Sequence, residues 1–280
     1  MSVQAIISAS VANGRNDMER KKDVMDLARH GGLITSKMTC GTCVKPMKES
    51  KSAKVKDGYR WRCTTCKSEK PIGYESFFQD ANLPVPEWLR FIVEWSRHDH
   101  ATILQLQNST LARIGDKTAK SMLKSIREFC DRIAFENEDE QLGGNGSAVT
   151  VVNIGVQCSM GHEIVLYIDD NVEHMVHNHG GIPIKPDSRI HTDMPALPAP
   201  APNNSIVLGL DSCPIADITA KREAAGNWWR LHRGVGCDRA HGVAGEYTVR
   251  KKYFRGAVNM RSDIFVDKLR IIYAPLFQNL

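Results

Sequence analysis

Two pairs of cysteines constrain the fold of this chain more than any other feature. Cys40 and Cys43 form one Cys-x2-Cys pair, and Cys63 and Cys66 form a second pair after 19 intervening residues. In a reducing compartment, two such pairs are typical of tetrahedral zinc ligation, because each short turn directs two sulfurs toward one ion. Four thiolates fill the coordination shell, so we expect a structural zinc ion rather than a catalytic one. A redox Cys-x2-Cys motif or a pair of disulfides is the alternative interpretation.

The segment between the two cysteine pairs has the character of a zinc ribbon. It is rich in lysine, contains the turn-forming Asp57-Gly58 pair and ends in the strand-like Tyr59-Arg60-Trp61-Arg62. Zinc would supply folding free energy that so small a unit cannot obtain from its own core. We therefore predict a zinc ribbon over residues 37–71, preceded by an N-terminal helical segment over residues 1–36.

Three helical patterns follow the ribbon within residues 72–140. Pro86 suits the first turn of a helix, and Trp88, Leu89, Ile92 and Trp95 recur at the spacing of an apolar helix face. A second, short helix is predicted around residues 101–107. After Gly115 and Asp116, a long basic amphipathic helix is predicted over residues 117–133, with an inner face made of Met122, Leu123, Ile126, Phe129, Cys130 and Ile133.

This order of helices predicts a helix-turn-helix, in which the last helix enters the major groove of DNA. The residues expected to face the DNA, through base edges or phosphates, are Lys117, Thr118, Lys120, Ser121 and Lys124. Up to residue 134 the chain has 23 Lys and Arg against 15 Asp and Glu, a net +8, whereas the remainder has 14 against 17, a net −3. A basic first half suits a polyanionic partner. The alternative is a plain three-helix bundle with a solvated basic face.

The rest of the sequence indicates a protein without membrane segments. No apolar run reaches the roughly 18 residues that span a bilayer, and the first residues lack a secretory signal. We therefore expect a protein that is not secreted and lies in a reducing compartment. Cysteines outside the ribbon lack ligand spacing and are interpreted as free buried thiols: Cys130, Cys158, Cys213 and Cys237. Residues 174–179, His-Met-Val-His-Asn-His, are interpreted as a surface loop rather than a transition-metal site.

Several motifs resemble the N-terminal region of Merlin-type transposases and of their bacterial insertion-sequence relatives. They are Ala28 to Ile34, the first cysteine pair, Asp57 to Cys63, Ser76-Phe77-Phe78 and Leu83 to Ser96, in the same order as in that family. The resemblance covers roughly residues 17–135. A shorter resemblance to the last helices of the family lies in Glu246 to Tyr253 and in Ile264 to Pro275.

The resemblance implies a ribonuclease-H-like domain over residues 148–280. In that family, two Asp and one Glu hold two divalent ions, Mg2+ or Mn2+, which stabilise the attacking and leaving oxygens during DNA strand transfer. The position of the first Asp corresponds to Asn153, whose neutral amide is a weak ligand for Mg2+. A second strand, Ile206 to Asp211, ends in an Asp that matches the second ligand or forms a turn at the strand end.

No residue fits the family motif for the third ligand, a Glu three residues before a Trp. Rival carboxylates are Asp169, Asp170, Glu223 and Glu246. We therefore expect a multidomain α+β protein in which the ribonuclease-H-like domain is degenerate and two-metal catalysis is impaired.

The leading hypothesis is a transposase-derived DNA-binding protein whose partner is DNA, including terminal inverted repeats. Two alternatives stay open at this point: an active transposase with ligands among the rival carboxylates, and a zinc-dependent protein-interaction module without DNA. The resemblance implies a nuclear location, with a cytoplasmic location otherwise, and is compatible with a homo-oligomer.

Overall fold

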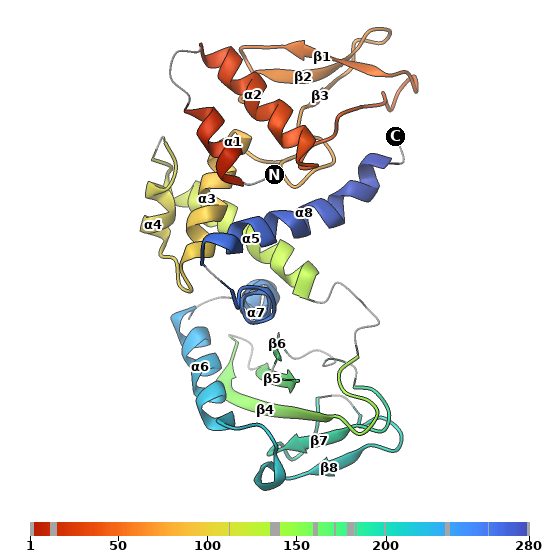
Figure 1. Ribbon diagram of the computed structural model, residues 1–280, viewed down its shortest axis with the longest axis vertical. Helices are drawn as coiled ribbons and strands as arrows, with labels where there is room; N and C mark the ends of the chain where they lie inside the picture. Colours follow the sequence, from red (N-terminus) through yellow and green to blue (C-terminus); the bar gives the residue numbers. More distant parts are fainter. Residues whose placement is uncertain are drawn as a thin grey trace. The chain divides into compact units, whose positions relative to one another are not determined.

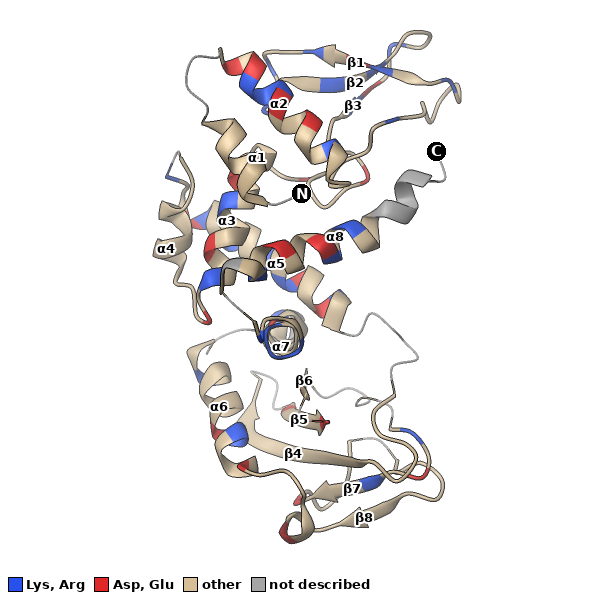
Figure 2. Cartoon of the chain, in the orientation of Figure 1, with Lys and Arg blue, Asp and Glu red and all other residues tan. Residues whose placement is uncertain are grey.

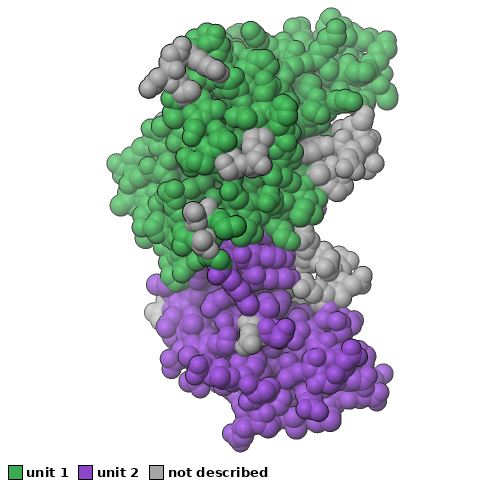
Figure 3. Space-filling view, viewed as in Figure 1, with its two compact units in different colours: residues 1–120, 256–280 green, residues 121–255 purple. Residues whose placement is uncertain are grey.

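The chain has a mixed α+β fold made of two compact units. The computed structural model describes residues 3–11, 16–111, 113–134, 141–158, 162–170, 172–177, 182, 184–198, 200–232, 236–256 and 258–278, without the side chains of residues 237, 238, 259 and 274–278. These residues form eight α-helices and two β-sheets (Figure 1). One unit contains residues 1–120 and 256–280, and the other contains residues 121–255 (Figure 3).

The first unit begins with two helices, α1 (Val3–Ser10) and α2 (Asp17–His30). Asn16 caps α2: its side chain accepts a hydrogen bond from the Glu19 amide at 3.0 Å, and the Glu19 carboxylate accepts one from the Asn16 amide at 3.1 Å. Acidic and basic residues are interspersed along α2 (Figure 2), while Val24, Met25 and Ala28 are buried. Polar i,i+4 pairs therefore stabilise one side of α2, and packing stabilises the other.

The ribbon sheet lies against α2. Its strands β1 (Met47–Lys51), β2 (Tyr59–Cys63) and β3 (Glu69–Pro71) are antiparallel in the order β1-β2-β3. One face buries Tyr59 and Trp61, and the Arg29 guanidinium lies 5.9 Å from the centre of the Trp61 ring. The same Arg29 makes an ion pair with Glu49 at 2.5 Å. Alternation along the strands leaves the opposite face to solvent.

Three helices follow the ribbon, as predicted: α3 (Val85–Arg97), α4 (Ile103–Asn108) and α5 (Asp116–Ala134). Thr102 caps α4 through a hydrogen bond with the Gln105 amide. The inner face predicted for α5 is confirmed, because its six apolar residues are all buried. A 3-10 turn, η2 (Val258–Met260), leads into the last helix, α8 (Arg261–Gln278).

The second unit is built on a mixed five-stranded sheet. Its strands are β4 (Ala148–Gln157), β5 (Glu163–Asp169), β6 (Val172–His177), β7 (Arg189–Thr192) and β8 (Ile206–Leu208), in the order β6-β5-β4-β7-β8. Strand β5 runs antiparallel to both of its neighbours, β4 and β6. Strand β7 runs parallel to β4, and β8 runs parallel to β7. Strand β5 is therefore antiparallel to the other four strands. Strand β4 carries no charged residue (Figure 2) and is buried along most of its length.

Helices α6 (Ile218–Leu231) and α7 (Cys237–Tyr253) cover one face of this sheet. Trp228 and Trp229 of α6 and Tyr247 of α7 pack there against Val152 and Leu166. The other face buries Val149, Val151, Val165, Tyr167 and Ile190 beneath the connections between strands. A 3-10 turn, η1 (Leu210–Ser212), follows β8.

The compact units differ from the predicted domain limits. We expect residues 148–280 to form one domain, but residues 256–280 belong to the first unit. The physical reason is packing of α8 on α3, where the Phe265 and Trp95 rings lie 4.9 Å apart, and a hydrogen bond from the Val3 amide to Asp263. Among the described residues, no helix is both long and apolar enough to cross a membrane.

A close helix contact in the second unit generates a stability prediction. A Cβ added at Gly245 of α7 would lie 2.5 Å from the Cα of Asp131 and 2.6 Å from its backbone nitrogen in α5. Gly245→Ala should therefore lower the free energy of unfolding by roughly 1–3 kcal/mol, although alanine is the better helix former. Thermal and denaturant unfolding measure the change.

Gly226→Ala in α6 is the matched control, because its added Cβ would meet its nearest atom, the Ile154 carbonyl oxygen, at 3.4 Å. This variant should be as stable as the natural protein or slightly more stable. Equal unfolding midpoints for the two variants would contradict the close contact of α5 and α7.

Candidate metal centre and nucleic-acid interface

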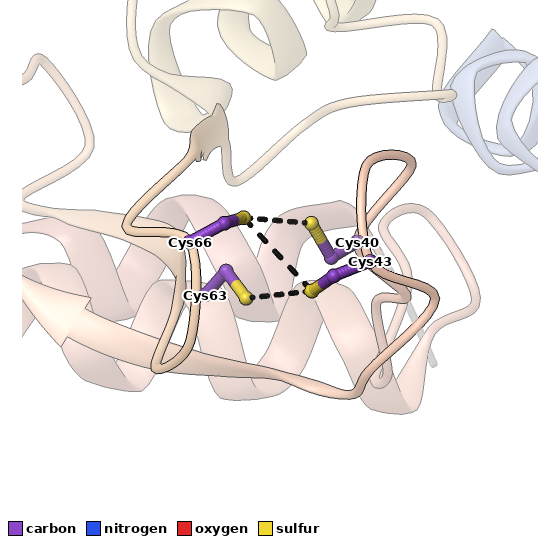
Figure 4. Close-up of side chains that lie close together, drawn as sticks. All are labelled: Cys40, Cys43, Cys63 and Cys66. Carbon is purple, nitrogen blue, oxygen red and sulfur yellow. Dashed lines mark hydrogen bonds between the residues drawn. The ribbon is translucent and has the colours of Figure 1, made fainter.

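Four cysteine sulfurs converge at one end of the ribbon. Figure 4 shows Cys40 and Cys43 on one loop and Cys63 and Cys66 on another, with their sulfurs turned toward a common point. The Sγ–Sγ distance is 3.4 Å for Cys40 and Cys66 and for Cys43 and Cys63, and 3.9 Å for Cys43 and Cys66. A tetrahedral zinc ion with Zn–S bonds of about 2.3 Å separates its sulfurs by about 3.8 Å. The cluster therefore fits a metal ion such as zinc.

The two cysteine turns have the same backbone construction. The Cys40 amide donates to the Lys45 carbonyl at 2.9 Å, and the Cys63 amide donates to the Ser68 carbonyl at 2.9 Å. The residue after the second cysteine of each pair, Val44 or Lys67, is left-handed, with φ of 56° and 63°. A left-handed β-branched valine is strained, so the site must hold that turn in place. This repetition explains how the Cys-x2-Cys spacing directs four sulfurs to one point.

Hydrogen bonds within these turns favour thiolates at two of the cysteines. The Ser68 hydroxyl, 3.1 Å from Cys40 Sγ, and the Cys43 amide lower the pKa of Cys40 to about 5. The Cys66 amide lowers the pKa of Cys63, although burial acts in the opposite direction. Metal ligation requires deprotonated cysteines, so these donors prepare the site for a cation.

Cys43 shows the opposite shift. The Lys45 amide lowers its pKa, but the neighbouring Cys63 sulfur and burial outweigh that effect and raise the pKa to about 11. Neighbouring thiols cannot all ionise at low cost when no cation lies between them. The disulfide interpretation is not supported, because all four cysteines are free and their sulfurs are well beyond the roughly 2.05 Å of a disulfide bond.

The residues predicted to contact DNA lie on one exposed side of α5. Lys117, Lys120, Ser121 and Lys124 are exposed, and Thr118 is half-buried. Lys120 makes an ion pair with Asp116 at 2.6 Å and Lys124 makes one with Glu128 at 3.5 Å. Such solvent-exposed pairs are weak, so both ammonium groups can exchange their carboxylate for a phosphate.

The predicted catalytic positions do not form a carboxylate cage. Asn153 lies at a bulge of β4, and its side chain accepts a hydrogen bond from the Gly155 amide at 2.8 Å. Strand β8 ends at Leu208 rather than at Asp211, where the sequence predicts its end, and Asp211 lies exposed in the turn η1. Among the described residues, the only groups of three or more candidate metal ligands are built from cysteine and histidine.

The rival carboxylates have other surroundings. Asp169 ends β5 and accepts a hydrogen bond from the Gly143 amide at 2.9 Å, while Asp170 is an exposed left-handed turn residue. Glu223 is exposed on α6. Glu246 is buried and bonded to two guanidinium groups, from Arg127 at 2.8 Å and from Arg250 at 3.0 Å.

The electrostatics of Glu246 indicate a structural role. Burial disfavours its charged form, but Arg127 and Arg250 outweigh that effect and lower its pKa to about 2. The carboxylate is therefore ionised and held by two cations in the core of the second unit. Removing the carboxylate would leave the buried Arg250 guanidinium without this anionic partner.

Two interpretations of the remaining cysteines and histidines were wrong. His174 and His177 are buried residues of β6 rather than parts of a surface loop, since both faces of the sheet are covered. Cys158 is disulfide-bonded and lies close to His162 and His177, so it is not an isolated thiol. Cys130 and Cys213 are free, and Cys130 is buried. Residues 178 and 179 and the Cys237 side chain lie outside the described part of the chain.

No family model matches this chain, and no curated protein and no solved structure is significantly similar to it. The resemblance to Merlin-type transposases therefore stays a prediction from the motifs.

The cysteine cluster generates a prediction on metal content. Cys63→Ser should lower the zinc content of the full chain by about one ion and expose residues 37–71 to proteolysis, because a structural site with three thiolates binds zinc weakly. Elemental analysis of the purified chain and limited proteolysis measure the two effects. Cys213→Ser, which changes a free cysteine outside the cluster, should leave both unchanged. Unaltered zinc content in Cys63→Ser would show that the cluster holds no metal.

Proposed function

We propose that this protein is a transposase-derived DNA-binding protein that holds duplex DNA against the exposed side of α5. The observation that carries the proposal is the placement of Lys117, Lys120, Ser121 and Lys124. They follow the i, i+3, i+4, i+7 spacing of one helix face, and the opposite face of α5 is buried. Such a helix presents a continuous row of donors and positive charges to a major groove or to phosphates.

Basic residues on the solvent-facing side of the ribbon sheet also favour DNA as the partner. Lys48 and Arg62 are cross-strand neighbours in β1 and β2, and both are exposed. Arg60 lies on the same side, two residues from Arg62, and pairs with Glu69 at 2.5 Å. This surface attracts phosphate groups without reading sequence. Zinc in the four-cysteine cluster would stabilise the sheet that presents it.

The sheet of the second unit supports descent from a ribonuclease-H-like domain. Such domains are built on a five-stranded sheet in the order 3-2-1-4-5, with the second strand antiparallel to the rest. Strands β4 to β8 have this order and these directions. The proline-rich connection between β7 and β8 contains no helix in its described residues 193–198 and 200–205, which fits our proposal that the domain is degenerate.

The surroundings of the carboxylates favour DNA binding over strand transfer. Two-metal catalysis needs carboxylates that converge on two ions about 4 Å apart. Here the first position is an amide, Asp211 is exposed in a turn, and Glu246 is held by two arginines. We therefore propose that Mg2+ or Mn2+ chemistry is impaired while binding to DNA, including terminal inverted repeats, persists in the nucleus.

The α5 surface can be tested by removing its three lysines. Lys117→Gln, Lys120→Gln and Lys124→Gln together should weaken binding to duplex DNA by about tenfold or more near physiological salt. The slope of log affinity against log salt should fall by about three, or one for each lost phosphate contact. Gel-shift titrations at several salt concentrations measure both quantities.

The matched control removes three exposed lysines that are scattered over the chain, Lys22, Lys37 and Lys185. Both triple variants lose the same net charge, so a general electrostatic effect would weaken both alike. DNA affinity that is unchanged in the α5 variant would exclude α5 as the DNA surface. A natural protein without salt-sensitive DNA binding would favour a zinc-dependent protein-interaction module.

Catalysis is tested separately with zinc-loaded protein and DNA that carries terminal repeats. We expect binding without nicking when Mg2+ or Mn2+ is added. Metal-dependent cleavage that Asp211→Asn abolishes would show that a working carboxylate set includes this residue, and the protein would then be an active transposase.

A further inference from the structure

The hairpin between β4 and β5 brings a cysteine and a histidine together. The Cys158 amide donates to the His162 carbonyl at 2.9 Å and closes the hairpin after the last residue of β4, Gln157. Cys158 is only 7% exposed, and His162 is half-buried. The spacing Cys-x3-His therefore places a thiol and an imidazole at the same end of the sheet.

A second imidazole reaches this position from the neighbouring strand. His177, the last residue of β6, pairs with Ile164 of β5, and its side chain is 2% exposed. The His162 and His177 rings are 5.5 Å apart. Ligand atoms of Cys158, His162 and His177 all lie within 4.8 Å of one another.

A third imidazole comes from the helix that covers this face. Nε2 of His241, in α7, lies 3.4 Å from Nδ1 of His177. Two imidazole nitrogens bound to one tetrahedral zinc ion at about 2.0–2.1 Å are separated by about 3.3–3.4 Å. The separation from His177 fits two ligands of one ion, whereas His241 lies outside the group of three whose ligand atoms are all within 4.8 Å of one another. The same separation also fits His177 as a ligand and His241 as a neighbouring residue that orients the His177 ring by a hydrogen bond.

His174, the other histidine of β6, does not join the cluster of Cys158, His162 and His177. It lies three residues before His177 on β6 and is also buried, but it pairs with Tyr167 and so faces the opposite side of the sheet. Tyr167 belongs to the core beneath the strand connections, whereas Ile164 belongs to the core beneath α6 and α7. Only His177 therefore meets Cys158 and His162.

We propose that Cys158, His162 and His177 bind a second zinc ion in the reduced protein, with His241 beside His177 in the fourth position. Thiolate and imidazole are the ligands that zinc prefers, and three of them meet at a largely buried point. The ion joins the β4–β5 hairpin to β6 and, through His241, to α7. Its role is structural: it holds the helix that carries Glu246 against the sheet.

Binding has a defined proton balance. Zinc replaces the proton of the Cys158 thiol, which passes to the buffer, and accepts lone pairs from the imidazoles. Cys158 is disulfide-bonded in the structure, so the ion binds only after reduction. In the assay, a water-soluble phosphine supplies the two electrons that convert the disulfide into two thiols, while one water molecule supplies the two thiol protons and the oxygen of the phosphine oxide.

The first experiment titrates Co2+ into the reduced, metal-free full chain. Cobalt takes the tetrahedral geometry of zinc, and its visible absorption distinguishes a four-sulfur site from a nitrogen-rich one. We expect two equivalents to bind, with two different spectra. Cys63→Ser should remove the four-sulfur spectrum and leave the nitrogen-rich one.

Variants of the histidines identify the ligands. His177→Ala should lower the zinc content of the reduced chain from about two ions to about one, while His174→Ala, the loss of an equally buried imidazole from the same strand, should leave two. His241→Ala tests the fourth position and should weaken the binding of the second ion while leaving the four-sulfur site unchanged. His177→Gln gives a second variant in case the alanine variant does not fold.

Two results would overturn the proposal. One is a natural, reduced chain that binds a single Co2+ with a four-sulfur spectrum alone. The other is a His177 variant that folds and keeps two zinc ions. In either case, the cluster would be a disulfide-linked hairpin flanked by histidines and not a metal site.

Discussion

The convergence of four cysteine sulfurs organises the N-terminal part of this protein. The ribbon sheet has three short strands, and its buried face offers few large side chains, chiefly Tyr59 and Trp61. Such a sheet is marginal by itself. Two turns with the same hydrogen bonds place the sulfurs 3.4–3.9 Å apart, so one cation could tie the two cysteine loops together at one end of the sheet. A metal ion bound there would support the exposed basic side of the sheet without a large core.

Helix α5 combines two roles along one length of chain. Its exposed lysines form the surface that we propose for DNA, and its later turns pack against α7 so closely that only glycine fits at position 245. The ion pair between Arg127 and Glu246 lies at the same contact. Ser121 and Lys124 belong to the same compact unit as this contact, so the packing on α7 holds this part of the helix in place. A helix held in this way presents its donors with little loss of entropy on binding.

The surroundings of Glu246 in α7 decide whether this carboxylate has a catalytic or a structural role. From the sequence alone, Glu246 is a rival for the third catalytic carboxylate, although it does not fit the family motif. Two guanidinium groups bind it in the core, so it neutralises buried positive charge and is not available for a divalent ion. Asn153 has no carboxylate, and Asp211 belongs to no group of three or more candidate metal ligands among the described residues. The loss of catalysis that we propose therefore rests on the whole arrangement and not on one substitution.

The sequence by itself determined the features that depend on neighbours along the chain. The four ribbon cysteines and the helices α3, α4 and α5 follow from spacing and periodicity, because turns and helix faces are set by residues a few positions apart. Only the tertiary structure decided that His177 meets Cys158 and His162 while His174 does not, since strand pairing and the covered sheet face set that contact. The same holds for α8, whose place in the first unit comes from packing on Trp95. Contacts between residues far apart in sequence depend on how helices and strands pack, and the spacing of residues within one element does not predict that packing.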